Sequence, residues 1–418
     1  MVDRVENRYN AQPLEFVQGR EPMRDSQGRL VVGRAVEITW GCAERMWQER
    51  ISCLKQHVDL TNAQVLVLQP HLDVTRDLYT DLTQNPLGSH PVATTADQEF
   101  SDNELDINVV REAAGAEHVV IVASILDERD LVRVGRVANH YKSVLNAGAV
   151  SAVLSFMAAT RQDKNVDKNG NYVSKPINIW GDLRMISGVV DFMSVLETHS
   201  SGTQAFAAMC GLPVAPLSPW ATCFEQMFKD GVQIKDQDGG HVIWPNSENA
   251  VIIRPDKGRN TAARRAERLF GIPGVALNKV RISGQTVEYY DLSVEEQKLI
   301  DGRLAYCYDD EGATFGTLEK IGLALSRYGA KCLIAGVMHA KLTNGWDNKA
   351  RSEMFNRIYL SNSREPIGTA SLSDKIRMFT LTPLLRDLVS AHLVGCNYWQ
   401  DPKYRPMVLQ LCDGEVDC

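Results

Sequence analysis

Short apolar runs separated by helix-length segments recur along most of this chain and constrain its fold more than any other feature. They occupy residues 65–68, 119–124, 152–156 and 192–196 in the first half, and 251–253, 304–308, 331–337 and 358–360 in the second. Such alternation predicts parallel strands with helices on both faces. Residues 229–246 are rich in Asp, Gly and Lys and are interpreted as a linker, so the repeated rhythm indicates two α/β domains.

Composition is that of a globular protein and excludes some classes of function. The 418 residues suffice for two domains plus extra material, and 44% hydrophobic with 23% charged residues argue against global disorder. A formal charge of −7 and an isoelectric point near 5.8 disfavour a general nucleic-acid or membrane-surface binder. Anionic ligands would therefore be held by local cations and metal.

Cysteine usage and the N-terminal residues indicate a soluble, cytoplasmic protein. The nine cysteines show no Cys-x-x-Cys pair or Cys/His ligand spacing, which is typical of a reducing compartment. The first residues lack the apolar segment of a secretory signal. The longest clean apolar run, residues 119–126, is too short to span a bilayer.

One candidate site follows the apolar run at residues 304–308. Asp309 and Asp310 come directly after it, and a small-residue turn with Thr314 and Thr317 leads into a helical stretch at residues 318–327. Ligands bind at the carboxyl ends of strands in open α/β sheets, and helix N-termini present free N–H groups to phosphate. Two carboxylates that accept hydrogen bonds from vicinal hydroxyls, beside such a turn, predict a site for a phosphorylated ribose. The alternative is an acidic surface turn.

This segment resembles the phosphoribosyl pyrophosphate (PRPP) loop of the phosphoribosyltransferase fold. With five other motifs in the same order, it resembles the ribose-phosphate diphosphokinase, or PRPP synthetase, family over roughly residues 62–395. Residues 100–104 are similar to Phe-Ser-Asp-Gly-Glu, 161–164 to Arg-Gln-Asp-Arg/Lys, 197–199 to Asp-Leu-His, 255–258 to Pro-Asp-x-Gly, and 279–281 to Lys-x-Arg.

The resemblance implies two tandem phosphoribosyltransferase-like, Rossmann-like domains with mainly parallel sheets. Residues 62–235 would form the domain on the ATP side, and residues 246–395 the domain with the ribose-phosphate loop. Residues 1–61 form an N-terminal extension outside the resemblance, either a cap or oligomer contact, or a substrate-selecting element. Residues 396–418 would be a peripheral tail.

The implied activity is transfer of the β,γ-pyrophosphoryl group of Mg²⁺-ATP to the anomeric hydroxyl of a 5-phosphoribosyl acceptor. The simplest acceptor is ribose 5-phosphate, which gives PRPP and AMP. Two alternatives remain open: the same chemistry on ADP-ribose, as in phage-type pathways that rebuild NAD, or a catalytically silent regulatory paralogue. The family also implies a homo-oligomer built from dimers, with a hexamer as one option, and no nucleic-acid or membrane partner.

The resemblance also assigns roles to individual residues of this chain. The catalytic residues would be Lys279, Arg281 and His199, and the metal would be held by His199 and Asp256. ATP would be bound by Phe100, Asp102, Glu104, Arg161 and Gln162, the first three serving a neighbouring subunit. The ribose phosphate would be bound by Asp309, Asp310, Thr314, Gly316 and Thr317. His339 is interpreted as structural.

Three residues depart from the family pattern. Ala313 replaces the third Asp of the loop, Phe315 replaces a small residue, and Arg259 replaces a Gly. Either Phe315 points away from the phosphate, or the phosphate end of the acceptor is bound differently. If Phe315 occupies the phosphate cradle, an acceptor with a phosphodiester linkage, such as ADP-ribose, becomes admissible.

Overall fold

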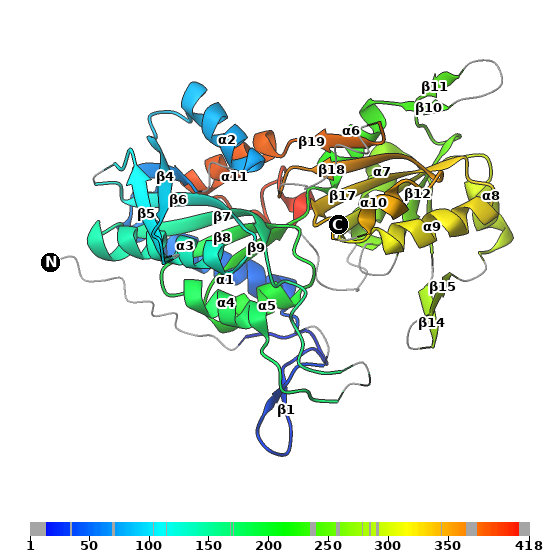
Figure 1. Ribbon diagram of the computed structural model, residues 1–418. Helices are drawn as coiled ribbons and strands as arrows, with labels where there is room; N and C mark the ends of the chain where they lie inside the picture. Colours follow the sequence, from blue (N-terminus) through cyan, green and yellow to red (C-terminus); the bar gives the residue numbers. More distant parts are fainter. Residues whose placement is uncertain are drawn as a thin grey trace. The chain divides into compact units, whose positions relative to one another are not determined.

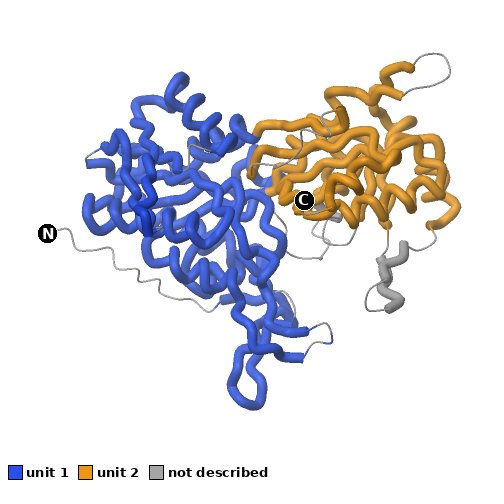
Figure 2. Tube along the Cα trace, viewed as in Figure 1, with its two compact units in different colours: residues 1–217, 381–418 blue, residues 218–380 orange. Residues whose placement is uncertain are grey.

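The computed structural model divides the chain into two compact units (Figure 2). Unit 1 comprises Met1–Leu217 and Leu381–Cys418, and unit 2 comprises Ser218–Thr380. The residues that the structure describes are 14–33, 36–68, 72–102, 104–113, 115–167, 169, 171–234, 240–255, 260–277, 279–283, 286–289, 292–343, 345–364 and 374–408.

Unit 1 is built on a seven-stranded sheet with the order β5-β4-β3-β6-β7-β8-β9. All neighbouring strands are parallel except the antiparallel edge pair of β4 and β5. The strands are β3 (Ala63–Val67), β4 (Val92–Glu99), β5 (Leu105–Val110), β6 (His118–Ile125), β7 (Ala149–Met157), β8 (Phe192–Leu196) and β9 (Val214–Leu217). Every residue of β6, β7 and β8 is buried, as expected of strands covered on both faces.

Helices cover both faces of this sheet (Figure 1). The crossover through α2 (Asp73–Gln84) steps from β3 to β4, whereas those through α3 (Glu128–Asn139), α4 (Asn178–Ile186) and α5 (Gly202–Met209) step the other way. Because such crossovers are right-handed, α2 lies on the face opposite to α3, α4 and α5. A π-helical turn (His140–Val144) continues α3.

The N-terminal extension is an integral part of unit 1. It contains a short hairpin, β1 (Met23–Arg24) with β2 (Leu30–Val31), and the helix α1 (Trp40–His57), whose first turn is capped by the side chain of Thr39. Trp47 of α1 is almost completely buried and packs edge-on against Phe192 of β8, with ring centroids 5.3 Å apart. Its indole N–H donates to the carbonyl of Cys396 at 2.9 Å.

The boundaries of the two units differ from the domain boundaries expected from the sequence. The helix α11 (Thr382–Leu393), expected in the C-terminal domain, packs on α2 of unit 1, where Arg386 forms an ion pair with Asp81 at 2.8 Å. The segment after it is not peripheral, because Tyr398 and Trp399 are buried around Trp47. A 3₁₀ turn (Arg405–Met407) ends the described part of this segment.

Unit 2 is built on a six-stranded, all-parallel sheet with the order β13-β12-β16-β17-β18-β19. The strands are β12 (Ala250–Arg254), β13 (Gly274–Ala276), β16 (Leu304–Gly312), β17 (Cys332–Ala340), β18 (Phe355–Ser361) and β19 (Ile376–Phe379). The helices α6 (Trp220–Lys229) and α7 (Asn260–Phe270) pack together, and α8 (Val294–Ile300), α9 (Gly316–Arg327) and α10 (Trp346–Ala350) complete the unit.

Two hairpins lie within the residues of unit 2. The pair β14 (Lys279–Ser283) and β15 (Thr286–Tyr289) follows β13. The pair β10 (Val232–Ile234) and β11 (His241–Ile243) lies in the stretch interpreted as a linker, so that interpretation is wrong for these residues. No helix in the described part of the chain is both long and apolar enough to cross a membrane.

Candidate active site

The aspartate pair lies within β16, close to its carboxyl end. The strand runs to Gly312, four residues beyond the apolar run at 304–308, because its pairing with β17 continues to Gly312 opposite Ala340. Adjacent strand residues point to opposite faces, so Asp309 is half-buried while Asp310 is only 3% exposed. The backbone N–H of Asp310 donates to Oδ1 of Asp309 at 3.0 Å.

The turn after β16 is held in place by the loop that follows β17. The N–H of Leu342 donates to the carbonyl of Gly312 at 3.0 Å, and the N–H of Thr343 donates to that of Ala313 at 2.9 Å. Helix α9 then begins at Gly316, with Thr314 and Thr317 exposed beside its N-terminus. Hydroxyls and helix N-terminal N–H groups therefore converge on one turn, an arrangement that suits an anionic group.

Phe315 points away from this turn. Its side chain is 3% exposed and belongs to the hydrophobic core of unit 2, where its ring centroid lies 6.0 Å from that of Trp346. Its backbone adopts a left-handed conformation, with φ of 57°, at the position before α9. Of the two alternatives for Phe315, the structure therefore selects the one in which the ring is directed into the core.

Lys349 is a candidate site residue that the sequence analysis missed. Its Nζ lies 3.1 Å from the position that a Cβ on Gly316 would occupy, and Oγ1 of Thr314 lies 3.4 Å from the same point. Lys349 has no ion-pair partner within the described part of the chain. It lies 33 residues after Gly316 on a different helix, so nothing in the local sequence connects the two.

A second group of candidates lies at the carboxyl ends of β7 and β8. Arg161 and Gln162 follow β7, His199 follows β8, and all three side chains are exposed. The hydroxyl of Ser200 donates to Oδ2 of Asp163 at 2.7 Å, which ties the two loops together. The structure thus joins the loops that contain two of the motifs within unit 1.

Phe100, Asp102 and Glu104 lie in the turn between β4 and β5. The N–H of Phe100 donates to the carbonyl of Glu104 at 2.9 Å, and the Phe100 side chain is 55% exposed. Since β3 and β6 lie between β4 and β7 in the sheet, this turn belongs to a different part of the sheet edge from Arg161.

Three arginines of α3 hold this hairpin. Arg129 pairs with Glu99 at 2.6 Å, Arg133 pairs with Asp97, and Arg136 donates to the carbonyl of Leu105 at 3.1 Å. Their spacing of four and three residues places them on one helix face. The hairpin that presents Phe100 is therefore fixed to the helix beside it.

Backbone strain is concentrated in the same loops. Of the six non-glycine residues described with positive φ, four follow β7, β8, β16 and β17 within a few residues: Ala159, Glu197, Phe315 and Leu342. Left-handed conformations are costly for residues with a Cβ and persist where the surroundings enforce them, frequently at functional sites. This distribution supports a functional role for the carboxyl ends of both sheets.

Comparisons with known proteins indicate one family of relatives. The chain is 24% identical over 306 residues to a ribose-phosphate pyrophosphokinase of Methanopyrus kandleri, covering 71% of this chain and 90% of that protein. It is 26% identical over 290 residues to the protein of the same name from Staphylococcus aureus, covering 66% and 80%. These relatives support a divergent member of the PRPP synthetase family.

A solved structure extends the likeness to the fold. The phosphoribosylpyrophosphate synthetase of Mycobacterium smegmatis superimposes with a TM-score of 0.57 at 16% identity, covering 79% of this chain and 98% of the other. It supports two phosphoribosyltransferase-like domains. No protein-family model matches the chain.

Several residues assigned through the PRPP synthetase motifs have no described side chain. Asp256 lies outside the described residues. Lys279 and Arg281 lie in β14, which is extended as expected, but only their backbone is described. His339, interpreted as structural, is buried, and its Nδ1 lies 2.9 Å from Oγ of Ser363.

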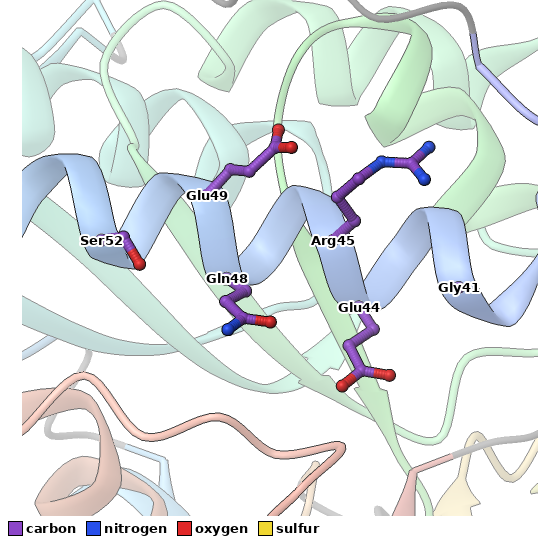
Figure 3. A pocket seen from close by; sticks show the side chains of 6 residues that line it. All are labelled: Gly41, Glu44, Arg45, Gln48, Glu49 and Ser52. Carbon is purple, nitrogen blue, oxygen red and sulfur yellow. The ribbon is translucent and has the colours of Figure 1, made fainter.

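A hollow along the outer side of α1 contains none of the residues assigned from the family (Figure 3). Its volume is about 430 Å³, and it is lined by Gly41, Glu44, Arg45, Gln48, Glu49 and Ser52. Within the described part of the chain, no group of three or more His, Cys, Asp or Glu could hold a metal ion.

Proposed function

We propose that this protein transfers the β,γ-pyrophosphoryl group of Mg²⁺-ATP to the anomeric hydroxyl of ribose 5-phosphate, giving PRPP and AMP. The observation that supports it most is the end of β16, where Asp309 and Asp310 adjoin the N-terminus of α9. Carboxylates suited to vicinal hydroxyls and a turn suited to phosphate are the two halves of a ribose 5-phosphate site.

Each loop has a role in this proposal. Asp309 and Asp310 bind the ribose hydroxyls, and Thr314, Gly316 and Thr317 bind the 5-phosphate, with Lys349 adding a positive charge. Nucleotide binding is assigned to Arg161 and Gln162 after β7, with Phe100, Asp102 and Glu104 contributing from the oligomer partner. Arg161 suits phosphate because its planar guanidinium can donate two parallel hydrogen bonds.

The reaction requires positioning and charge neutralisation rather than a covalent intermediate. The anomeric oxygen forms a bond to the β-phosphorus, the bond from that phosphorus to the oxygen bridging to the α-phosphate breaks, and the hydroxyl proton leaves to solvent. Lys279 and Arg281 are assigned to the charge that develops on the transferring group, which preorganised cations stabilise. His199 is assigned to the ATP phosphates.

Mg²⁺ would neutralise the phosphate oxygens of ATP. The residues proposed to hold it are Asp256 and His199. Mg²⁺ prefers oxygen ligands, retains waters and shares substrate phosphates. The proposal therefore has the metal shared between these residues and the phosphates of the nucleotide.

Ala313 keeps ADP-ribose open as an alternative acceptor, since it removes a carboxylate from the phosphate loop. Phe315 no longer supports that alternative, because its ring lies in the core and does not enlarge or fill the turn. A cytoplasmic homo-oligomer remains part of the proposal.

The deciding experiment incubates the protein with Mg²⁺-ATP and either ribose 5-phosphate or ADP-ribose, and identifies products by mass spectrometry. We expect AMP and PRPP with the first acceptor, and no AMP without acceptor or Mg²⁺. ADP as the stoichiometric product would contradict pyrophosphoryl transfer. A pyrophosphorylated ADP-ribose would reassign the acceptor, and the absence of both products would favour a silent paralogue.

A further inference from the structure

Within the N-terminal extension, residues 30–32 are held to the segment after β7 by the buried side chain of Asn165. The Oδ1 of Asn165 accepts a hydrogen bond from the N–H of Val32 at 2.7 Å, and its Nδ2 donates to the carbonyl of Leu30 at 2.8 Å. The backbone N–H of Asn165 donates to the carbonyl of Val32 at 3.2 Å. Asn165 is only 6% exposed. Its side chain and backbone form hydrogen bonds to the backbone of residues 30–32, as a neighbouring strand would.

Further contacts join the same two segments. The guanidinium of Arg29 lies 4.3 Å from the ring centroid of Tyr172, close enough for a cation–π interaction. The side chain of Val166 lies 3.6 Å from the position of a Cβ on Gly33, so the backbone packs closely there. In Figure 1 the hairpin containing β1 and the segment that follows β7 lie together at one end of the unit.

From Asn165 the contacts continue into the loops that contain the candidate site. Asp163, two residues earlier and 4% exposed, accepts from the hydroxyl of Ser200 at 2.7 Å. That hydroxyl oxygen accepts from the N–H of Gly202 at 3.2 Å, the first residue of α5. A Cβ on Gly202 would lie 3.3 Å from the Asp163 carboxylate, so the two loops approach closely.

The loop after β7 contains both buried and exposed residues, and the two groups differ in their contacts. Asp163 and Asn165 are buried and make the anchoring contacts, whereas Arg161, Gln162 and Lys164 are exposed, as is His199 in the adjoining loop. Contacts that fix Asp163 and Asn165 therefore also determine the direction of the exposed side chains in these loops.

We infer that the N-terminal extension is a positioning element for nucleotide binding, acting through Asn165 on the loops of Arg161 and His199. This rests on the proposed function, which assigns those loops to ATP. Coupling between two sites is reciprocal. Binding of Mg²⁺-ATP should therefore protect residues 30–32, and loosening residues 30–32 should weaken Mg²⁺-ATP binding.

The test compares Asn165→Ala with the wild type and with Asn139→Ala, in the full chain. Asn139, an exposed residue at the C-terminus of α3 whose Oδ1 accepts from the hydroxyl of Ser143 at 3.0 Å, is the control for loss of an asparagine side chain away from these loops. Binding of Mg²⁺-ATP is measured by calorimetry without acceptor, and amide hydrogen exchange is followed at Leu30 and Val32.

We expect Asn165→Ala to raise the Kd and the KM for Mg²⁺-ATP about 10-fold, equivalent to one good hydrogen bond, and to leave the KM of the acceptor unchanged. Asn139→Ala should change neither. In the wild type, Mg²⁺-ATP should slow exchange at Val32, and this protection should be lost in Asn165→Ala.

Faster exchange at Val32 in Asn165→Ala with unchanged affinity for Mg²⁺-ATP would overturn the inference, because the extension would then be packing only. If Asn165→Ala does not fold, Tyr172→Leu removes only the contact with Arg29, and a smaller loss of affinity is expected; no loss would overturn the inference. Wild-type binding of Mg²⁺-ATP without turnover on either acceptor would refute the proposed function alone. No binding by the wild type would refute both.

Discussion

The ring of Phe315 lies 6.0 Å, centroid to centroid, from the indole ring of Trp346, in the hydrophobic core of unit 2. The two residues belong to different segments that meet under the turn after β16. This contact directs the one bulky residue of the turn inward, so the exposed surface of the turn is formed by the threonines and Gly316. Phe315 therefore contributes to the core of unit 2, and we predict that it does not select the acceptor.

Phe315→Ala should lower the free energy of unfolding by about 3–5 kcal/mol, because it deletes a buried ring and leaves a cavity. The ratio of kcat/KM for ribose 5-phosphate to that for ADP-ribose should not change. Urea denaturation followed by fluorescence measures the first effect, and steady-state assays measure the second. Leu323→Ala is the control, since Leu323 on α9 is 52% exposed and its substitution should cost little stability. A change in the acceptor ratio with unchanged stability would return Phe315 to the phosphate site.

Lys349→Met should raise the KM of the phosphorylated acceptor about 10-fold or more and leave the KM of ATP unchanged. The ammonium group lies at the start of α9, where a charge-assisted hydrogen bond to phosphate is worth about 1.5–3 kcal/mol. Lys349→Arg should retain much of the affinity. Lys331→Met is the control, because Lys331 precedes β17 at the opposite edge of the sheet and is exposed. An equal rise in the KM of the acceptor for Lys349→Met and Lys331→Met would mean that the net charge of the protein, and not the position of Lys349, determines acceptor binding.

Lys279→Ala and Arg281→Ala should each lower kcat by about 10²–10⁴-fold with little effect on ATP affinity, because both are assigned to the transition state. On an extended strand, residues two apart share a face. Single-turnover assays and ATP titrations separate the two effects. Val280→Ala, between them on the strand, is the matched control. Near-wild-type turnover of both charge variants would show that β14 takes no part in the chemistry.

Acid should destabilise unit 1 through two buried histidines. Burial lowers the pKa of His118 to about 4, and burial also lowers the pKa of His392 well below its ordinary value. In the native state the Nδ1–H of His118 donates to the carbonyl of Leu60 at 3.2 Å, while its Nε2 lies 2.9 Å from the hydroxyl of Ser151. That arrangement suits the neutral ring.

Because the folded pKa values lie below the unfolded value of about 6.5, the unfolded state binds protons first as the pH falls. Above that pH the histidines add no pH dependence. Below it, stability should fall by up to about 1.4 kcal/mol per pH unit for each histidine, until pH 4 is reached for His118. Urea unfolding between pH 7.5 and 5 measures the slope. His392→Phe, which keeps a ring between Trp47 and Phe192, should reduce it, and an unchanged slope would assign the effect to other groups.

The sequence by itself determined the fold class and the positions of the main strands along the chain. All eight apolar runs coincide with strands to within one residue, from β3 to β18, because a strand buried on both faces must be apolar throughout and therefore stands out locally. The motifs at Phe100, Arg161, His199 and Asp309 were likewise visible, since each combines a strand end with polar residues a few positions away. Their assigned roles remain predictions.

Only the tertiary structure decided which distant segments meet. The return of α11 to unit 1, the burial of Phe315, the approach of Lys349 to Gly316 and the attachment of residues 30–32 to Asn165 all depend on contacts across many residues. The local sequence indicates the hydrophobic periodicity of a helix or strand and its capping residues, but it does not indicate which distant segment buries that helix or strand. From the sequence, the ring of a phenylalanine in a small-residue turn could point either to the exposed side of the turn or into the core. Here the ring of Phe315 packs against Trp346 in the core.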